Sequence, residues 1–376
     1  MKANGFKNLE EADLSPHRYM NILYGSNAQG KTNFIESVWV CTGCRSFRGT
    51  KERDYVGFNK PRSEIIMEFC DSERRQSVAI RHDKERKFRR NMALNGVNIN
   101  SLSQLFGSFE AVVFTPEDLE LSKGSPDARR NYMNTGISQL RKSYHIDVVS
   151  YNRAIMHRNA VIKNILLGMA KKSDLDIWDT QLARFGAAII SARSRYIRDI
   201  AKKAEQLYND ISSGKERLEL YYLSSVFRDV REYGEMDFCN PLAIPEIRRR
   251  YELALNRWQD SDIKSGMTVN GVHRDDIITK INGVMSREFG SQGQSRSIAL
   301  VMKLAQAQLI EETVGEAPVV LLDDVLSELD PQRQEFVLRR LDGFQVFVTC
   351  CDRVSAMRFG EGKIFYVENG KIREEN

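Results

Sequence analysis

The spacing of apolar residues changes along this chain from a strand-like to a helix-like pattern. Over roughly the first 120 residues, short runs of β-branched and aromatic residues are bounded by turn residues, which is typical of strands. The predicted strands are 63–69, 77–82, 87–92 and 111–114. From about 126 to 212, apolar residues recur every three or four positions with Arg and Lys between them. This pattern predicts long helices over 138–167 and 175–210.

The strand-like pattern returns in the last third of the chain. A strand is predicted at 219–226 and a helix at 241–258, and short apolar runs follow at 276–281, 317–322 and 344–349. We therefore expect an α/β fold whose main domain is built from both chain ends, 1–120 and 263–376, with a helical arm lobe, 121–262, inserted between them.

One glycine-rich segment has the chemistry of phosphate binding. Residues 25–32, GSNAQGKT, fit the pattern G-x-x-x-x-G-K-[ST] between a predicted strand, 19–24, and a predicted helix, 33–40. In such a P-loop, backbone N–H groups and the helix N-terminus surround the phosphates, the Lys contacts the β and γ phosphates, and the hydroxyl binds Mg²⁺. The residues expected to bind ATP are Gly25, Ser26, Asn27, Ala28, Gln29, Gly30, Lys31 and Thr32. We also expect Lys31 to act in catalysis.

Two adjacent carboxylates follow the apolar run 317–322. P-loop ATPases hold Mg²⁺ through water at this place, so we expect Asp323 to hold the metal together with Thr32. We expect Asp324 to orient or deprotonate the attacking water. Many ATPases of this type have Glu at that position, and an Asp side chain is one methylene shorter. Because proton transfer requires hydrogen-bond reach, we expect slow hydrolysis that serves as a switch.

The order of the motifs indicates an ABC-type ATPase head. Most of the chain separates Lys31 from Asp323, whereas simpler P-loop domains bring these motifs much closer in sequence. Segment 289–296, FGSQGQSR, resembles the signature motif of this class, and 327–330, SELD, resembles its subunit-contact loop. In ABC-type dimers the signature contacts the nucleotide of the other subunit. We therefore expect ATP to drive homodimerisation, with Ser291, Gly293 and Gln294 at the partner's γ-phosphate.

Composition narrows the class of protein. The 376 residues are 41% hydrophobic, which is enough for a substantial core. No apolar run approaches the ~20 residues of a membrane helix, and the N-terminus has no signal-peptide pattern, so we expect a cytoplasmic protein without membrane contact. The six cysteines have neither disulfide-framework nor zinc-site spacing, and reduced thiols are expected.

The positive charge is locally clustered. The net charge of +5 and the pI of about 8.8 are compatible with a polyanionic partner. The candidate DNA-binding residues are Arg45, Arg48, Lys84, Arg86, Lys87, Arg89, Arg90 and Arg129, and several of them precede the hairpin signal Asn95-Gly96. Solvated or edge-protecting strand faces explain the clusters as well. The roles of Arg129, Arg130, His273 and Arg274 stay open between ligand contact and packing.

Several further motifs resemble those of the RecF family of bacterial DNA replication and repair ATPases. They are GFKNL at 5–9, FTPEDL at 114–119, GSPDARR at 124–130 and HRDD at 273–276, together with the P-loop, the SQGQ signature and the paired aspartates. The resemblance covers almost the whole chain. It implies a two-lobe ATPase that dimerises with ATP, clamps gapped or double-stranded DNA, and works with RecR and RecO to place RecA. Val272 and the pair Cys350-Cys351 depart from the residues usual in that family.

Two other functions stay open at this point. An ATP-gated protein-interaction module without direct DNA binding would use the arm for a protein partner. DNA binding through several phosphate contacts weakens steeply as salt rises, whereas hydrophobic docking does not. The energy subunit of a transporter is the third possibility, and the helical insertion and the basic hairpin argue against it.

Overall fold

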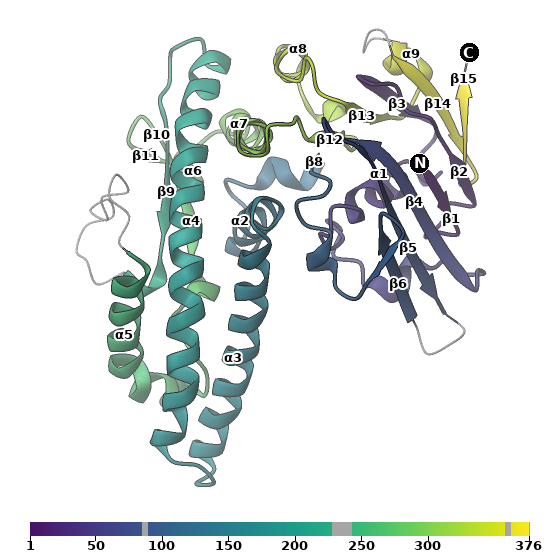
Figure 1. The fold of residues 1–376 in the computed structure, drawn as a ribbon. Coiled ribbons are helices and arrows are strands. Elements are labelled where there is room, and N and C mark those ends of the chain that lie inside the picture. The colour runs from purple at the N-terminus through teal and green to yellow at the C-terminus, as the bar shows by residue number, and fades with distance from the viewer. Residues whose placement is uncertain (85–88, 228–242, 358–361, 376) are drawn as a thin grey trace. The chain divides into compact units, whose positions relative to one another are not determined.

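The computed structural model describes residues 1–84, 89–227, 243–357 and 362–375. These residues form two compact units, one from Met1–Leu119 with Ala299–Asn376 and the other from Glu120–Ile298 (Figure 1). The expected break near residue 120 agrees with this division. The second break lies later than the sequence predicted. Residues 263–298 were predicted to belong to the C-terminal half of the head, 263–376, but they group with the inserted unit.

One twelve-stranded sheet organises the first unit. Its strands are β1 (Lys2–Asn4), β2 (Glu11–Asp13), β3 (Met20–Tyr24), β4 (Arg62–Cys70), β5 (Arg75–Asp83), β6 (Arg89–Leu94), β7 (Val97–Ile99), β8 (Ala111–Phe114), β12 (Val319–Leu322), β13 (Val346–Cys350), β14 (Lys363–Glu368) and β15 (Lys371–Glu375). The order is β7-β6-β5-β4-β1-β2-β15-β14-β3-β13-β12-β8. Early and late strands alternate in it, which confirms the expected α/β head made from both chain ends.

The nucleotide motifs lie in the parallel part of this sheet. Strand β13 pairs in parallel with β3 and β12, and β12 pairs in parallel with β8. All residues of β8 and β13 are buried, as expected for strands covered on both faces. Because the carboxyl ends of parallel strands lie at one edge, loops far apart in sequence meet there.

The antiparallel part contains the predicted hairpin. Strands β6 and β7 pair with Leu94 opposite Val97, and Asn95 and Gly96 have φ values of 52° and 78°. Two positive φ values characterise the type I′ turn that an Asn-Gly pair favours. The hairpin signal is therefore confirmed.

The helices of the first unit are α1 (Lys31–Val40), α8 (Pro331–Arg340) and α9 (Arg353–Ala356), and α7 (Gln292–Val314) lies in it from residue 299 onward. Helix α1 buries Phe34, Ile35 and Val38 in the main hydrophobic core, together with Leu23 of β3 and Phe347 of β13. This packing fixes the start of α1 relative to the sheet. None of the described helices is long and apolar enough to cross a membrane.

The second unit is largely helical. It contains α2 (Pro126–Leu140), α3 (Lys142–Leu166), α4 (Asp176–Ile211), α5 (Ile244–Ser265) and α6 (Ser286–Phe289), with β9 (Leu218–Leu223), β10 (Asp276–Ile281) and β11 (Val284–Met285) in a three-stranded antiparallel sheet. The pairing of β9 with β10 ties residues 276–281 to the arm, which is why the second break lies later than expected. The helix predicted at 138–167 is divided, because Arg141 has the extended angles φ −148° and ψ 99°.

Candidate nucleotide-binding and hydrolysis site

The P-loop connects β3 to α1 with three residues at positive φ. Gly25, Ala28 and Gly30 have φ values of 157°, 65° and 119°. A Cβ atom on Gly25 would lie 2.2 Å from the Val367 carbonyl oxygen, so glycine is required there both for conformation and for space. The loop closes around the side chain of Lys31, whose Nζ donates to the carbonyls of Gly25 (2.8 Å) and Ser26 (3.1 Å). Its ammonium group is thereby held inside the loop, where a P-loop binds phosphate.

The two halves of the site meet at Thr32. Its Oγ1 donates to Oδ1 of Asp323 over 3.0 Å. Oγ1 of Thr349 lies 3.0 Å from the same Asp323 oxygen. The Thr349 Oγ1 atom also accepts from the Asp324 N–H over 2.8 Å. Thr349 therefore joins the adjacent aspartates to the end of β13.

Asp323 is buried, and its pKa is raised to about 6, mainly by desolvation and then by the nearby Asp324 carboxylate. A bound cation would offset the desolvation cost of the ionised Asp323 carboxylate. The described residues contain no cluster of three or more His, Cys, Asp or Glu side chains that could hold a metal. One hydroxyl and one carboxylate nevertheless fit Mg²⁺, which usually keeps several waters and takes phosphate oxygens as ligands.

Asp324 lies beside this pair in a strained conformation. Its φ of 53° is in the left-handed region, which non-glycine residues adopt rarely and often at functional sites. Its side chain is only partly buried, and Oδ1 lies 3.3 Å from Thr349 Oγ1. The carboxylate is thus partly accessible and lies next to Asp323, the candidate metal-binding residue.

The C-terminal hairpin contacts the P-loop, which the sequence did not predict. The N–H groups of Asn369 and Gly370, in the turn between β14 and β15, donate to Gln29 Oε1 (2.6 Å) and Gln29 O (3.0 Å). Asn8 donates to the Ala28 carbonyl over 2.9 Å. An Asn-Gly pair between two apolar runs was the available signal.

A depression of about 860 Å³ lies beside the P-loop residues Ala28 and Gln29. Phe58, whose surface is 94% exposed, lines it together with Lys84, and Lys84 Nζ lies 5.8 Å from the Phe58 ring centroid. An exposed aromatic ring beside a cation can stack on a flat ring of a ligand. Sequence reasoning missed Phe58, since nothing in its neighbours marks an exposed aromatic.

The signature segment forms the start of α7. Ser291 Oγ accepts from the Gln294 N–H (3.1 Å), and Gln294 Oε1 accepts from the Ser291 N–H (2.7 Å), which is a capping box. Gly293 lies in the first turn of the helix. Ser291, Gly293 and Gln294 belong to the second unit, whereas the P-loop belongs to the first.

The candidate DNA-binding residues differ in their surroundings. Arg45 and Arg48 are exposed, and Lys84 is exposed at the depression beside the P-loop. Arg90 is partly buried and forms an ion pair with Glu52 over 2.5 Å. Arg86 and Lys87 lie outside the described residues, and Arg89 is described only as the first residue of β6.

Arg129 has a structural role in this fold. Its side chain is 2% exposed, and its guanidinium donates to both Asp276 oxygens (2.6 and 2.9 Å) and to two backbone carbonyls. All these partners compete with phosphate, so Arg129 is corrected from a DNA-binding candidate to a packing residue. Its neighbour Arg130 donates to the Asp275 carbonyl over 2.8 Å.

The HRDD segment, 273–276, is also mostly internal to the second unit. Asp275 is fully buried and accepts from the Ser225 N–H (2.8 Å), from Arg193 Nη1 (3.1 Å) and from the Tyr222 hydroxyl. His273 Nε2 lies 3.2 Å from the Thr268 carbonyl. Because a carbonyl only accepts, Nε2 carries the proton, and Nδ1 accepts from the Tyr151 hydroxyl over 3.2 Å.

We expect His273 to make the protein less stable in acid. Burial lowers its pKa from 6.5 to about 4. As the pH falls below 6.5, the unfolded chain takes up the proton first, so the free energy of unfolding decreases by roughly 1–3 kcal/mol down to pH 4. Burial lowers the pKa of His82 in the same way. Chemical denaturation between pH 7.5 and 4.5 should therefore show a shallower pH dependence in His273→Gln.

The same substitution at the exposed His157 of α3 is the matched control for the loss of an imidazole from the second unit. An unchanged slope in His273→Gln would contradict the assignment.

The described cysteines, Cys41, Cys44, Cys70, Cys350 and Cys351, are free thiols, as expected.

Comparisons with known proteins identify the family of this chain. The family described as RecF/RecN/SMC N terminal domain matches residues 1–372. The DNA replication and repair protein RecF of Clostridium tetani is 35% identical over 376 residues, covering 100% of this chain and 98% of that protein. The RecF protein of Alkaliphilus oremlandii is 33% identical over 374 residues, covering 99% and 98%.

Solved structures give the same result. The structure of the recombination mediator protein RecF with ATPrS, from the RecFOR pathway, superposes with a TM-score of 0.90 at 32% identity, covering 100% of this chain and 97% of that one. The Smc head domain of Pyrococcus furiosus superposes with a TM-score of 0.54 at 15% identity, covering 100% and 95%. The second match indicates a shared ABC-type fold.

Proposed function

Because this chain belongs to the RecF family, we propose that it is an ATP-dependent DNA-binding protein of replication and repair, which dimerises on ATP and clamps gapped or double-stranded DNA. We further propose that it helps to load a recombinase together with RecR and RecO. The observation that carries the ATP-dependent part is the 3.0 Å contact between Thr32 and Asp323. It unites a P-loop hydroxyl with a carboxylate from the other end of the chain.

Each residue of the site has a role in this proposal. Lys31 and the N-terminus of α1 bind the β and γ phosphates, and Thr32 and Asp323 hold Mg²⁺. When bound, the metal neutralises charge on the phosphate oxygens. Asp324 accepts the proton of the attacking water or orients it. The nucleoside lies in the depression beside Ala28 and Gln29, against Phe58.

Dimerisation follows from the position of the signature. Ser291 and Gln294 cap the first turn of α7, and a helix N-terminus attracts negative charge. We propose that this end contacts the γ-phosphate bound by a second subunit. ADP lacks that group, so the dimer responds to ATP.

The test is binding to a gapped duplex, measured by fluorescence anisotropy with ATP or ADP while the mass of the complex is followed by light scattering. We expect ATP alone to give both a dimer and salt-sensitive DNA binding. A dimer that ignores DNA would contradict the clamp and support the ATP-gated protein-interaction module. The absence of an ATP-dependent dimer would contradict both functions.

Salt dependence tests one proposed DNA contact. We expect Arg45→Gln to weaken binding uniformly across DNA sequences and to lower the slope of log K against log salt by about one, because Arg45 is exposed and would neutralise one phosphate. Lys172→Gln is the control, since Lys172 pairs with Asp260 on the surface of the second unit. Equal slopes in the wild type and Arg45→Gln would remove Arg45 from the interface.

A further inference from the structure

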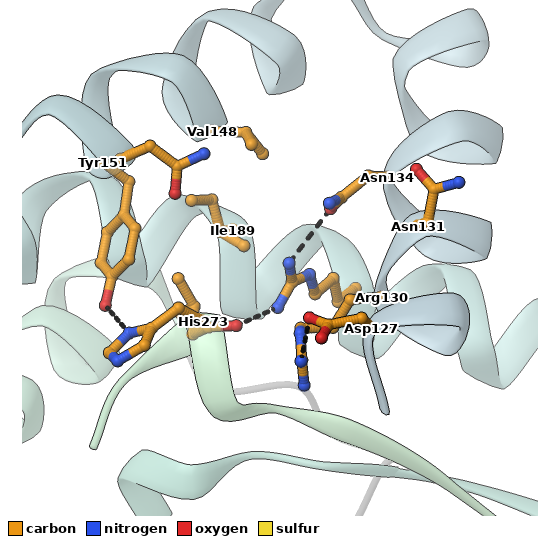
Figure 2. A pocket seen from close by; sticks show the side chains of 11 residues that line it. Asp127, Arg130, Asn131, Asn134, Val148, Tyr151, Ile189 and His273 are labelled. Atoms are coloured by element: carbon orange, nitrogen blue, oxygen red, sulfur yellow. Dashed lines mark hydrogen bonds and ion pairs between the residues drawn. The ribbon is translucent and has the colours of Figure 1, made fainter. Parts of the chain in front are cut away.

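A pocket of about 280 Å³ opens in the second unit, and no residue assigned to ATP lines it (Figure 2). Helices α2, α3 and α4 and the 3-10 helix Val272–Arg274 supply its walls. Val148, Ile189 and Val272 form apolar parts of the wall, and Arg130, Asn134 and Asn152 are among its polar residues. Neither the ATPase reaction nor the proposed DNA contacts use this pocket.

Most buried polar groups of the wall are already bonded to protein. Tyr151 lies between the Tyr251 hydroxyl (2.8 Å) and His273 Nδ1. Arg193 donates from Nε to the Tyr144 hydroxyl (3.0 Å) and from Nη1 to the Val272 carbonyl (2.6 Å). These side chains therefore give the pocket a rigid wall and do not supply free acceptors to a ligand.

Asn134 presents a donor of fixed orientation. Its Oδ1 accepts from Arg193 Nη2 (3.0 Å) and from the Tyr144 hydroxyl (2.6 Å). These two bonds determine which end of the amide is oxygen. The Nδ2 amino group has no hydrogen-bond partner in the described part of the chain, so two N–H donors remain for a ligand.

Arg130 adds positive charge at the same pocket. Its side chain is 13% exposed; Nη1 donates to the Asp275 carbonyl, and Nη2 pairs with Asp127. Among the residues that the structure describes, Nε of Arg130 has no partner. The Asp127 side chain is 89% exposed, so its pairing with Arg130 is weak and easily exchanged.

The free donors, the cation and the apolar wall residues together select a class of ligand. Fixed donors beside apolar walls suit an acceptor group on a short apolar body, and an ionised acceptor makes the stronger hydrogen bonds. One available cation with a carboxylate next to it favours a monoanion over a phosphate dianion. At about 280 Å³ the pocket lies just below the usual range for ligand pockets, roughly 300–1,000 Å³. We propose that the pocket binds a monocarboxylate about the size of one amino-acid residue, either a free acid or the C-terminal residue of a polypeptide.

The first measurement is calorimetric titration of the full chain with isovalerate, and with isovaleramide as the neutral control of equal shape. We expect saturable binding of the acid and none of the amide. Two tripeptides, glycyl-glycyl-leucine with a free or an amidated C-terminus, identify the source. Tighter binding of the free peptide than of isovalerate indicates a polypeptide terminus, and binding of isovalerate alone indicates a free acid.

The decisive variant is Asn134→Asp. It keeps an oxygen for Arg193 and Tyr144 but replaces the two donors by a negative oxygen, so we expect isovalerate binding to weaken by at least about tenfold. Asn164→Asp, the same change at an exposed position of α3, should bind as the wild type does. If Asn134→Asp does not fold, Arg130→Gln takes its place, with the same expected loss. No saturable binding, equal binding of acid and amide, or unaltered binding in the folded variant would overturn the proposal.

Discussion

Asp324→Asn is expected to lower kcat for ATP hydrolysis by about 10²- to 10⁴-fold, while ATP binding and ATP-dependent dimerisation persist. The amide has the shape of the carboxylate but cannot take a proton from water. Asn also tolerates the left-handed conformation that residue 324 adopts, with φ of 53°. Single-turnover hydrolysis and light scattering in the same samples measure the two properties separately.

Asp342→Asn is the matched control, because Asp342 is exposed in the same unit and follows α8. It should hydrolyse ATP at the wild-type rate. An Asp324→Asn protein that dimerises with ATP and hydrolyses it at the parental rate would eliminate Asp324 as the catalytic carboxylate. Thr349 would then have to be considered as the group that orients water, since it lies between Asp323 and Asp324.

Arg158→Leu should be the most destabilising of the substitutions considered, at about 3–5 kcal/mol of unfolding free energy. Arg158 on α3 is fully buried and donates to Asp179 on α4 (2.5 Å) and to Asp262 on α5 (2.7 Å). One cation thus serves two carboxylates, and its removal leaves both buried without charge compensation. Burial already raises the pKa of Asp179.

Urea unfolding followed by the fluorescence of Trp178 and Trp258, both in the second unit, measures this loss. The loss should be smaller at pH 5 than at pH 7.5, since a carboxyl with a raised folded-state pKa destabilises the fold only when ionised. Replacing the whole triad, with Asp179→Leu and Asp262→Asn added, should restore much of the stability. Asn at 262 retains an acceptor for the Val269 N–H.

Lys172→Met is the control for Arg158. It breaks the Lys172–Asp260 pair, whose side chains are 58% and 71% exposed, and water replaces the lost contact. We expect little change in unfolding. A comparably small effect of Arg158→Leu would show that the buried triad contributes no net stability.

Local sequence determined the elements that carry the nucleotide chemistry. The pattern of residues 25–32 specifies a loop with positive φ at its glycines, because short-range sterics decide which residues adopt those angles. The Asn95-Gly96 turn and the alternation of strands and helices were predictable for the same reason. Family membership was also predictable, because the motifs typical of the family occur along the sequence itself.

Only the tertiary structure decided which polar side chains are available. In the sequence, Arg45 and Arg129 each lie close to other basic residues, and both were candidates for DNA binding. In the structure, Arg45 is exposed, whereas Arg129 is enclosed by Asp276 and two carbonyls. Gln29 likewise has a partner that is distant in sequence. Its side-chain oxygen accepts from the N–H of Asn369, in the turn between β14 and β15. Backbone conformation depends mainly on neighbouring residues, whereas burial and partners depend on segments that folding brings together from distant parts of the chain.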